Sequence, residues 1–126
     1  MFLKKRSKRL LALVLSVMMI AGSTLAVSAG SLAKVTNTIN GVYYSGGVQI
    51  VSSSRVMAFM DTDDSTVYTY AQGSIRNSDG NIILNLNAGG NGGFYYNNSQ
   101  LVNASYGTVT FYGSLSRVVG VAYPYV

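Results

Sequence analysis

Apolar and polar residues alternate along the chain beyond residue 30, in short runs separated by glycine, asparagine and aspartate. A period of two is typical of strands with one face in a core and the other in solvent. No segment repeats apolar residues at helical spacing. The pattern predicts an all-β fold: a small single-domain antiparallel β-sandwich, with a small β-barrel as the alternative. The expected strands are Val42–Tyr44, Val48–Val51, Arg55–Asp61, Val67–Arg76, Ile82–Asn87, Phe94–Tyr96, Thr108–Tyr112 and Arg117–Tyr123.

The clearest element is a hairpin that joins Val67–Arg76 to Ile82–Asn87. Asp79-Gly80 at its tip is typical of a type I′ turn, in which both central residues have positive φ. A two-residue loop fixes the register, so that Ile75 faces Leu84, Ala71 faces Ala88 and Arg76 faces Ile83. The buried side of the first strand then carries Val67, Thr69, Ala71, Gly73 and Ile75. Its outer side carries Tyr68, Tyr70, Gln72, Ser74 and Arg76.

Three further patterns give expectations about packing. Arg55–Asp61 is apolar on both faces, which predicts a central strand covered on both sides. The glycine-rich stretch Asn87–Gly93 predicts a flexible connection, because a phosphate-binding loop would need a lysine and a following helix. Segment 41–59 echoes segment 93–111, which indicates either chance similarity or a duplication whose halves form the two sheets.

Residues 1–29 have the three parts of a helical secretory signal peptide. The basic part contains Lys4, Lys5, Arg6, Lys8 and Arg9. The apolar run Leu10–Ala21 is 12 residues long, whereas a membrane-spanning helix needs about 20. The small residues before Ala29 suit signal peptidase, so cleavage is expected there, with a β domain over 30–126. We expect a secreted extracellular protein without a stable membrane anchor, and the short basic leader favours a Gram-positive bacterium.

The positive charge of the chain is concentrated in this leader. The full sequence has nine basic and four acidic residues and a net charge of +5, but five of the basic residues lie in 1–29. The remaining charges cancel: they are Lys34, Arg55, Arg76 and Arg117 against Asp61, Asp63, Asp64 and Asp79. Association with nucleic acid depends on basic side chains that release counterions, so the neutral domain excludes a nucleic-acid partner.

Residues 30–126 contain no His, Cys or Glu. Their absence excludes Ser-His-Asp and Cys-His catalysis, histidine or thiolate metal sites, and disulfides. Asp63 and Asp64 are adjacent, so on a strand they would point to opposite faces and could not act as a paired acid and base. We therefore predict a protein that is not an enzyme and has no resident cofactor.

The segment 61–65 is the one concentration of negative charge. Asp61, Asp63 and Asp64 offer the oxygen ligands that Ca²⁺ prefers and form a candidate calcium site. The alternative is a solvated turn whose Asp and Ser side chains cap nearby backbone N–H groups. The segment lacks the glycine and the distant Glu of an EF-hand loop.

Tyrosine is the distinguishing residue, because all ten tyrosines lie beyond the leader. On the outer side of the hairpin, Tyr68 and Tyr70 predict a flat aromatic platform that Gln72 and Arg76 extend with hydrogen-bond donors. The C–H faces of sugars stack on such rings, and tyrosine is also enriched in protein interfaces. These four residues are the candidate ligand-binding site, unless a second sheet covers this side.

The sequence therefore predicts a secreted binding protein that recognises a glycan or a protein through a tyrosine-rich β surface. One alternative is a self-assembling extracellular structural protein. Low charge and the apolar segment Ile82–Leu86 favour such self-association at strand edges. The other alternative is a bacteriocin-like or pore-forming toxin, although a neutral domain is not attracted to anionic membranes.

Overall fold

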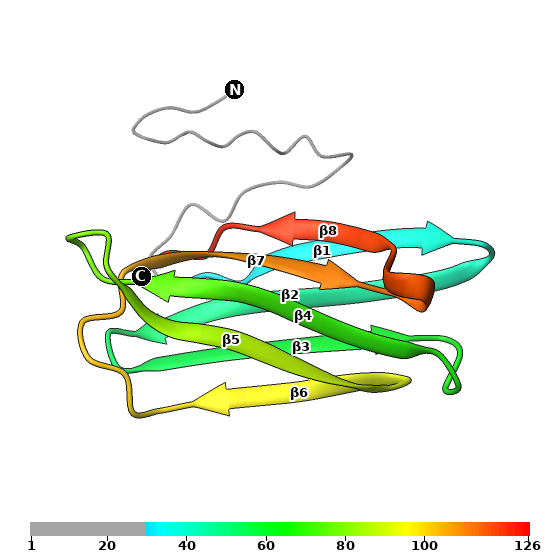
Figure 1. Ribbon diagram of the computed structural model, residues 1–126, viewed down its shortest axis with the longest axis horizontal. Helices are drawn as coiled ribbons and strands as arrows, with labels where there is room; N and C mark the ends of the chain where they lie inside the picture. The colour runs from blue at the N-terminus through cyan, green and yellow to red at the C-terminus, as the bar shows by residue number, and fades with distance from the viewer. Residues whose placement is uncertain (1–29) are drawn as a thin grey trace, which may run out of the picture.

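Eight strands make up most of residues 30–126 (Figure 1). The computed structural model describes residues 30–126, so the predicted signal peptide and its cleavage at Ala29 lie outside the described residues. The all-β prediction is confirmed, and no helix in 30–126 is long and apolar enough to cross a membrane. The elements are β1 (Ala33–Ile39), β2 (Val42–Ser52), β3 (Arg55–Thr62), β4 (Tyr68–Arg76), β5 (Ile82–Asn91), β6 (Gly93–Asn98), β7 (Tyr106–Tyr112), the 3₁₀ turn η1 (Ser114–Ser116) and β8 (Val118–Ala122).

The strands form two antiparallel sheets of four strands each. One sheet has the order β1-β2-β3-β6 and the other the order β5-β4-β7-β8. The two sheets meet along both sides: β1 lies beside β8, and β5 turns directly into β6 (Figure 1). On the β1–β8 side the Asn37 side-chain amide donates to the carbonyl oxygen of Val119 at 3.3 Å.

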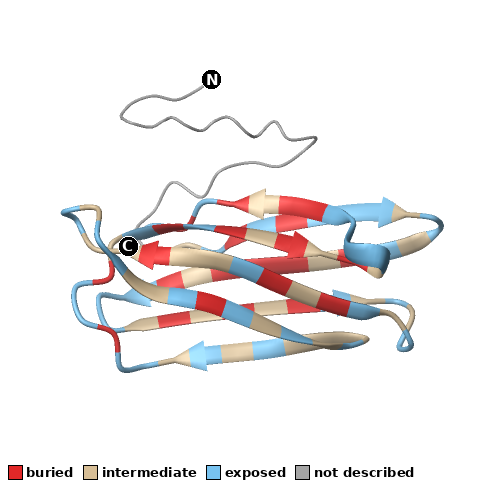
Figure 2. Ribbon diagram, viewed as in Figure 1, coloured by how far each residue is buried: buried red, intermediate tan, exposed pale blue. Residues whose placement is uncertain are grey.

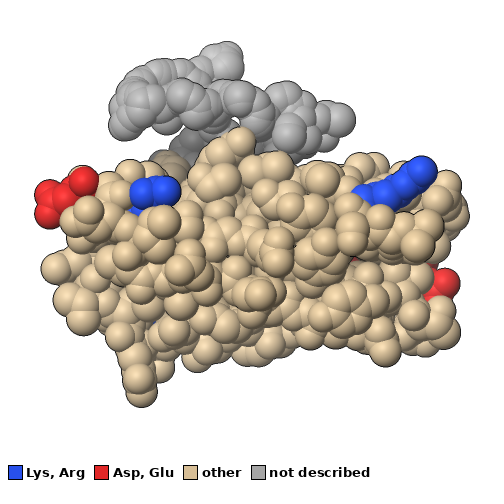
Figure 3. All heavy atoms as spheres, in the orientation of Figure 1, with Lys and Arg blue, Asp and Glu red and all other residues tan. Residues whose placement is uncertain are grey.

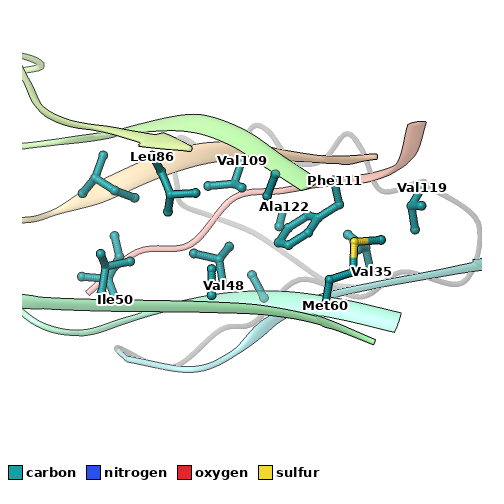
Figure 4. Packing of buried hydrophobic residues seen from close by; sticks show 14 of the residues in the cluster. Val35, Val48, Ile50, Met60, Leu86, Val109, Phe111, Val119 and Ala122 are labelled. Atoms are coloured by element: carbon teal, nitrogen blue, oxygen red, sulfur yellow. The ribbon is translucent and has the colours of Figure 1, made fainter. Parts of the chain in front are cut away.

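The core lies between the sheets. Val48, Ile50 and Met60 of the first sheet point toward Leu86, Val109 and Phe111 of the second (Figure 4), and all six are buried. Along each strand buried and exposed residues alternate, as expected for one covered face per sheet (Figure 2).

Phe111 is the largest apolar side chain that is fully buried, and a glycine makes room for it. A Cβ atom on Gly46 of β2 would lie 3.1 Å from Cδ2 of the Phe111 ring. Tyr44, also fully buried, accepts a hydrogen bond at its hydroxyl from the backbone N–H of Ser114 at 3.1 Å, which ties the β7–β8 connection to the opposite sheet.

The predicted hairpin register is confirmed over most of its length. Ala71 pairs with Ala88, Gly73 with Leu86 and Ile75 with Leu84. The predicted pairing of Arg76 with Ile83 is wrong, because a bulge lets Ile82 face Arg76 instead.

The predicted type I′ turn is also wrong. Gly80 has a φ of 88°, whereas Asp79 does not adopt a positive φ. The Gly80 N–H donates to the carbonyl of Asn77, and the Asn77 side-chain oxygen accepts from the N–H groups of Asp79 and Asn81, each at 3.0 Å. The tip is thus a three-residue loop ending in a left-handed glycine. Its extra residue and the bulge at Ile82 offset each other, which restores the predicted register.

Three strand assignments from the sequence need correction. The expected strands Val42–Tyr44 and Val48–Val51 are one continuous strand, β2. The stretch Asn87–Gly93 is not a flexible connection, because β5 continues along β4 to Asn91 and only Gly92, with a φ of 75°, makes the turn to β6. Strand β1 was not expected at all. Its outward residues Lys34, Thr36 and Thr38 are polar, and the inward series Ala33, Val35 and Ile39 is interrupted by the polar Asn37.

The prediction for Arg55–Asp61 is correct for one face only. Val56, Ala58 and Met60 of β3 are buried in the core, but Met57 and Phe59 on the outer face stay partly exposed. No second layer of residues 30–126 therefore covers this face.

The echoed segments 41–59 and 93–111 do not form the two sheets, so the arrangement expected of a duplication is not found. Their first halves, in β2 and β6, belong to the same sheet. Phe59 lies on an outer face, whereas its counterpart Phe111 lies in the core.

Phe111 and Phe59 offer a matched pair for testing where the core lies. We expect Phe111→Ala to lower the free energy of unfolding by about 3–5 kcal/mol, since it leaves a cavity between the sheets. Phe59→Ala should cost only about 1 kcal/mol, because its ring keeps one side in solvent. Chemical denaturation measures both; equal losses would contradict this assignment of the core.

Candidate functional site

The outer face of the second sheet is open to solvent, and β4 lies at its centre. Tyr70 pairs with Tyr112 of β7, and Gln72 pairs with Thr110 of β7 and with Asn87 of β5. We call this surface the tyrosine face. Its members are Tyr68, Tyr70, Gln72, Ser74 and Arg76 from β4, Asn85, Asn87 and Gly89 from β5, and Tyr106, Thr108, Thr110 and Tyr112 from β7. The alternative that a second sheet covers these residues does not hold for the described part of the chain, because Tyr68 is 55% exposed.

Three tyrosines form a cluster at one end of the tyrosine face. The ring centroids of Tyr70 and Tyr112 are 4.5 Å apart, and the planes differ by 12°, so the rings are stacked. The Tyr68 ring follows at 6.0 Å from Tyr70 with a tilt of 32°. Both separations fall in the range where aromatic pairs attract each other.

Gly89 of β5 gives Tyr68 its position. A Cβ atom on Gly89 would lie only 2.5 Å from the Tyr68 hydroxyl, so the tyrosine extends over the glycine and across β5. A side chain at Gly89 would displace the ring. Because Gly89 has no side chain, the Tyr68 ring can lie over β5.

The sequence predicts a platform made by the two rings of Tyr68 and Tyr70, but the structure places these rings in different environments. Stacking occupies one face of Tyr70 and one face of Tyr112, and both side chains are only partly exposed. Tyr68 is the ring that remains most open to a ligand. The cluster is thus one exposed ring supported by a stacked pair.

Side-chain amides without hydrogen-bond partners in the described part of the chain extend from the aromatic cluster along β4 and β5. The side chains of Gln72, Asn85 and Asn87 are exposed, and none of them forms a hydrogen bond within residues 30–126. Each amide offers two donors and an acceptor. The tyrosine face therefore presents an aromatic ring beside a neutral row of donors and acceptors.

Charge is nearly absent from this region. In the view of Figure 3 the charged side chains lie near the two ends of the molecule, and the broad middle consists of uncharged residues. Arg76, a predicted ligand-binding residue, is separated from the tyrosine cluster: it lies six residues beyond Tyr70, about 20 Å along the strand. Its guanidinium donates to the carbonyl oxygen of Gly80 at 2.7 Å, so it braces the hairpin tip.

The structure thus brings Tyr68, Tyr70 and Gln72 together and sets Arg76 apart. Sequence reasoning missed Tyr112, because the pairing of β4 with β7 joins segments about forty residues apart and no local pattern reveals it. A signal was present, however. In the expected strand Thr108–Tyr112 the apolar residues Val109 and Phe111 fix the buried face, so Tyr112 was bound to face outward.

The candidate calcium ligands are not brought together. An Asp63 side-chain oxygen accepts from the backbone N–H of Tyr43 at 3.2 Å. Asp64 accepts from the N–H and hydroxyl of Thr66, at 3.0 and 2.6 Å. Asp61 is the penultimate residue of β3 and is exposed. No group of three acidic side chains in residues 30–126 is placed to hold a metal ion, and the capped-turn alternative describes Asp63 and Asp64 better.

The Asp64 carboxylate has a lowered pKa. Hydrogen bonds from the Thr66 hydroxyl and, to a smaller extent, the Thr66 backbone N–H favour the ionised form. Because the folded-state pKa is depressed, the stabilisation from this interaction is present above the unfolded pKa and is lost as the pH falls through the folded pKa.

Replacement of the Thr66 hydroxyl should reverse this effect. In Thr66→Val we expect the pKa of Asp64 to rise toward that of an ordinary aspartate, since only the backbone donor remains. A carboxyl-carbon NMR titration of both proteins measures the change, and Ser65→Ala is the matched control in the same turn. An unaltered Asp64 titration in Thr66→Val would refute the role of the hydroxyl.

No protein-family model, curated protein or solved structure matches the chain. What the tyrosine face binds is therefore inferred from its own geometry and chemistry.

Proposed function

We propose that the protein is a secreted, non-enzymatic β-sandwich that binds an uncharged glycan at the cell exterior through the tyrosine face. The observation that supports this is the exposed ring of Tyr68, from which the unbonded amides of Asn87, Gln72 and Asn85 extend along β5 and β4. A sugar ring has an apolar C–H face that stacks on an aromatic ring, and hydroxyls that need both donors and acceptors. The tyrosine face offers these two features side by side.

The charge distribution favours an uncharged ligand. Residues 30–126 have a net charge of zero, and the arginine of the tyrosine face is held by the hairpin tip. An acidic polysaccharide or a phosphorylated surface would gain little here, because recognition of anions depends on available arginine and lysine side chains. A neutral polysaccharide needs no arginine or lysine partners, so their absence does not weaken its binding.

The open shape of the surface fits an extended polymer. The outward side chains of β5, β4 and β7 form one continuous surface, since they lie on the same side of a single sheet. An extended polysaccharide can contact Tyr68 and then the amides along β4 and β5. Export by the predicted signal peptide would deliver the protein to where such polymers occur.

Loss of Tyr68 should abolish most of this binding. We expect Tyr68→Ala to weaken retention on insoluble chitin or cellulose about tenfold, as for a contact worth about 1.4 kcal/mol. Gln72→Ala should weaken it less. The measurement is a pull-down in which the bound fraction is followed against the amount of polysaccharide.

Tyr95 of β6 supplies the matched control, because it is 63% exposed but lies on the outer face of the other sheet. Tyr95→Ala should bind like the unaltered protein. Retention that is unchanged in both Tyr68→Ala and Tyr70→Ala would overturn the proposal. A protein ligand captured only by the unaltered tyrosine face, with no polysaccharide retained, would show that the face recognises a protein instead.

A further inference from the structure

Strand β5 forms one edge of the second sheet and lacks the features that usually protect such an edge. Within residues 30–126 it pairs only with β4, although it is ten residues long. It contains no charged residue and no proline, which are the usual means of keeping an edge from pairing with another chain.

The other three edges are shorter or protected. β6 has six residues. β1 carries Lys34, and its Asn37 bonds to Val119 of β8, so these two edges lie against each other. Pro124 follows β8. β5 is therefore the one long, neutral edge in the described part of the chain.

The backbone groups of β5 that face away from β4 can be identified. The carbonyl of Val67 accepts from Gly92 on the β5 side, and the carbonyl of Arg76 accepts from Ser105 on the β7 side. Because backbone groups alternate along a strand, Thr69, Ala71, Gly73 and Ile75 face β5. Their partners Leu84, Leu86, Ala88 and Gly90 are thus bonded to β4. The N–H and C=O groups of Asn85, Asn87, Gly89 and Asn91 point outward from the edge, and Asn91 directly precedes the turn at Gly92.

Of these, Asn85 and Gly89 lie symmetrically on either side of Asn87. On one side the regular ladder ends at the bulge near Ile82, and on the other the chain turns into β6 at Gly92. An antiparallel strand centred on Asn87 pairs Asn85, Asn87 and Gly89, and it places the two irregular ends, Asn91 before the turn and the bulge near Ile82, opposite each other. The edge is therefore complementary to itself.

We infer that β5 pairs with β5 of a second copy of this chain, antiparallel and centred on Asn87. Asn87 then faces Asn87 of the second copy, and Asn85 faces Gly89 of the second copy, over which that copy's Tyr68 hydroxyl lies. The two copies have no net charge outside the leader and do not repel each other. This inference goes beyond glycan binding and does not depend on it.

Such pairing produces a closed dimer rather than a fibre. A twofold interface uses the same patch on both copies, so no second β5 edge remains for a third copy. The paired sheets become one sheet of eight strands, and both tyrosine faces lie on the same side. Two linked faces bind a repeating polymer more tightly than one, because the second contact is intramolecular.

Opposite charges at position 87 test the proposal. We expect the unaltered protein to show a monomer–dimer equilibrium in sedimentation velocity as the concentration rises. Asn87→Lys and Asn87→Asp should each weaken dimerisation about fivefold, since like charges then lie directly opposite. An equimolar mixture of the two variants should restore the dimer. Asn97→Lys on β6 is the matched control and should dimerise normally.

Single cysteines in this cysteine-free chain test the register. Directly opposed residues in a hydrogen-bonded pair have Cα atoms about 5.5 Å apart, within the range that a disulfide spans. Under mild oxidation Asn87→Cys should cross-link to a dimer, whereas Asn85→Cys and Asn97→Cys should not.

A sharp monomer at every concentration would overturn the inference, as would association that Asn87→Lys leaves unchanged. Growth beyond the dimer would also overturn it. Melting curves that match the unaltered protein exclude unfolding as the cause of any loss. Tyr68→Ala should dimerise normally, so failure of glycan binding and failure of pairing are distinguishable.

Discussion

The ring of Phe111 reaches from one sheet to the other and packs against Gly46, and the remainder of the structure depends on this contact between the sheets. Every strand has an apolar side that must be removed from water, and the two sheets achieve this only by facing each other. The core is built mainly from aliphatic side chains around this single buried phenylalanine (Figure 4). Glycines opposite the large rings let the backbones approach closely enough to fill the gap.

Because each sheet has one side in the core, its other side is free for a different purpose. On the second sheet that free side is the tyrosine face, where Tyr68 extends over Gly89 and Tyr70 stacks on Tyr112. The same β5 strand contributes Gly89 to this face and its outward backbone groups to the open edge. Ligand binding and dimer formation, as proposed, therefore share one strand but use different atoms of it: side chains for the ligand and backbone for the second copy.

Local chemistry in the sequence was sufficient for several features. The alternation along Val67–Arg76 identified the outward position of Tyr68 and Tyr70, and the hairpin register was correct from Ile75 to Ala71. The turn type was wrong, yet the register survived because the three-residue loop and the bulge near Ile82 compensate. Strand β1 escaped detection, since the polar Asn37 interrupts its inward apolar residues Ala33, Val35 and Ile39.

The sequence by itself determined that residues 30–126 are all-β and carry no net charge, and which hairpin residues face outward. These properties follow from composition and from a period of two, which are local. Only the tertiary structure decided that β7 lies beside β4. This pairing adds Tyr112 to the tyrosine face and stacks its ring on that of Tyr70. The tertiary structure also separated Arg76 from the cluster and left β5 as an edge. Strand neighbours distant in sequence are selected by the packing of the whole core, and no local pattern encodes that choice.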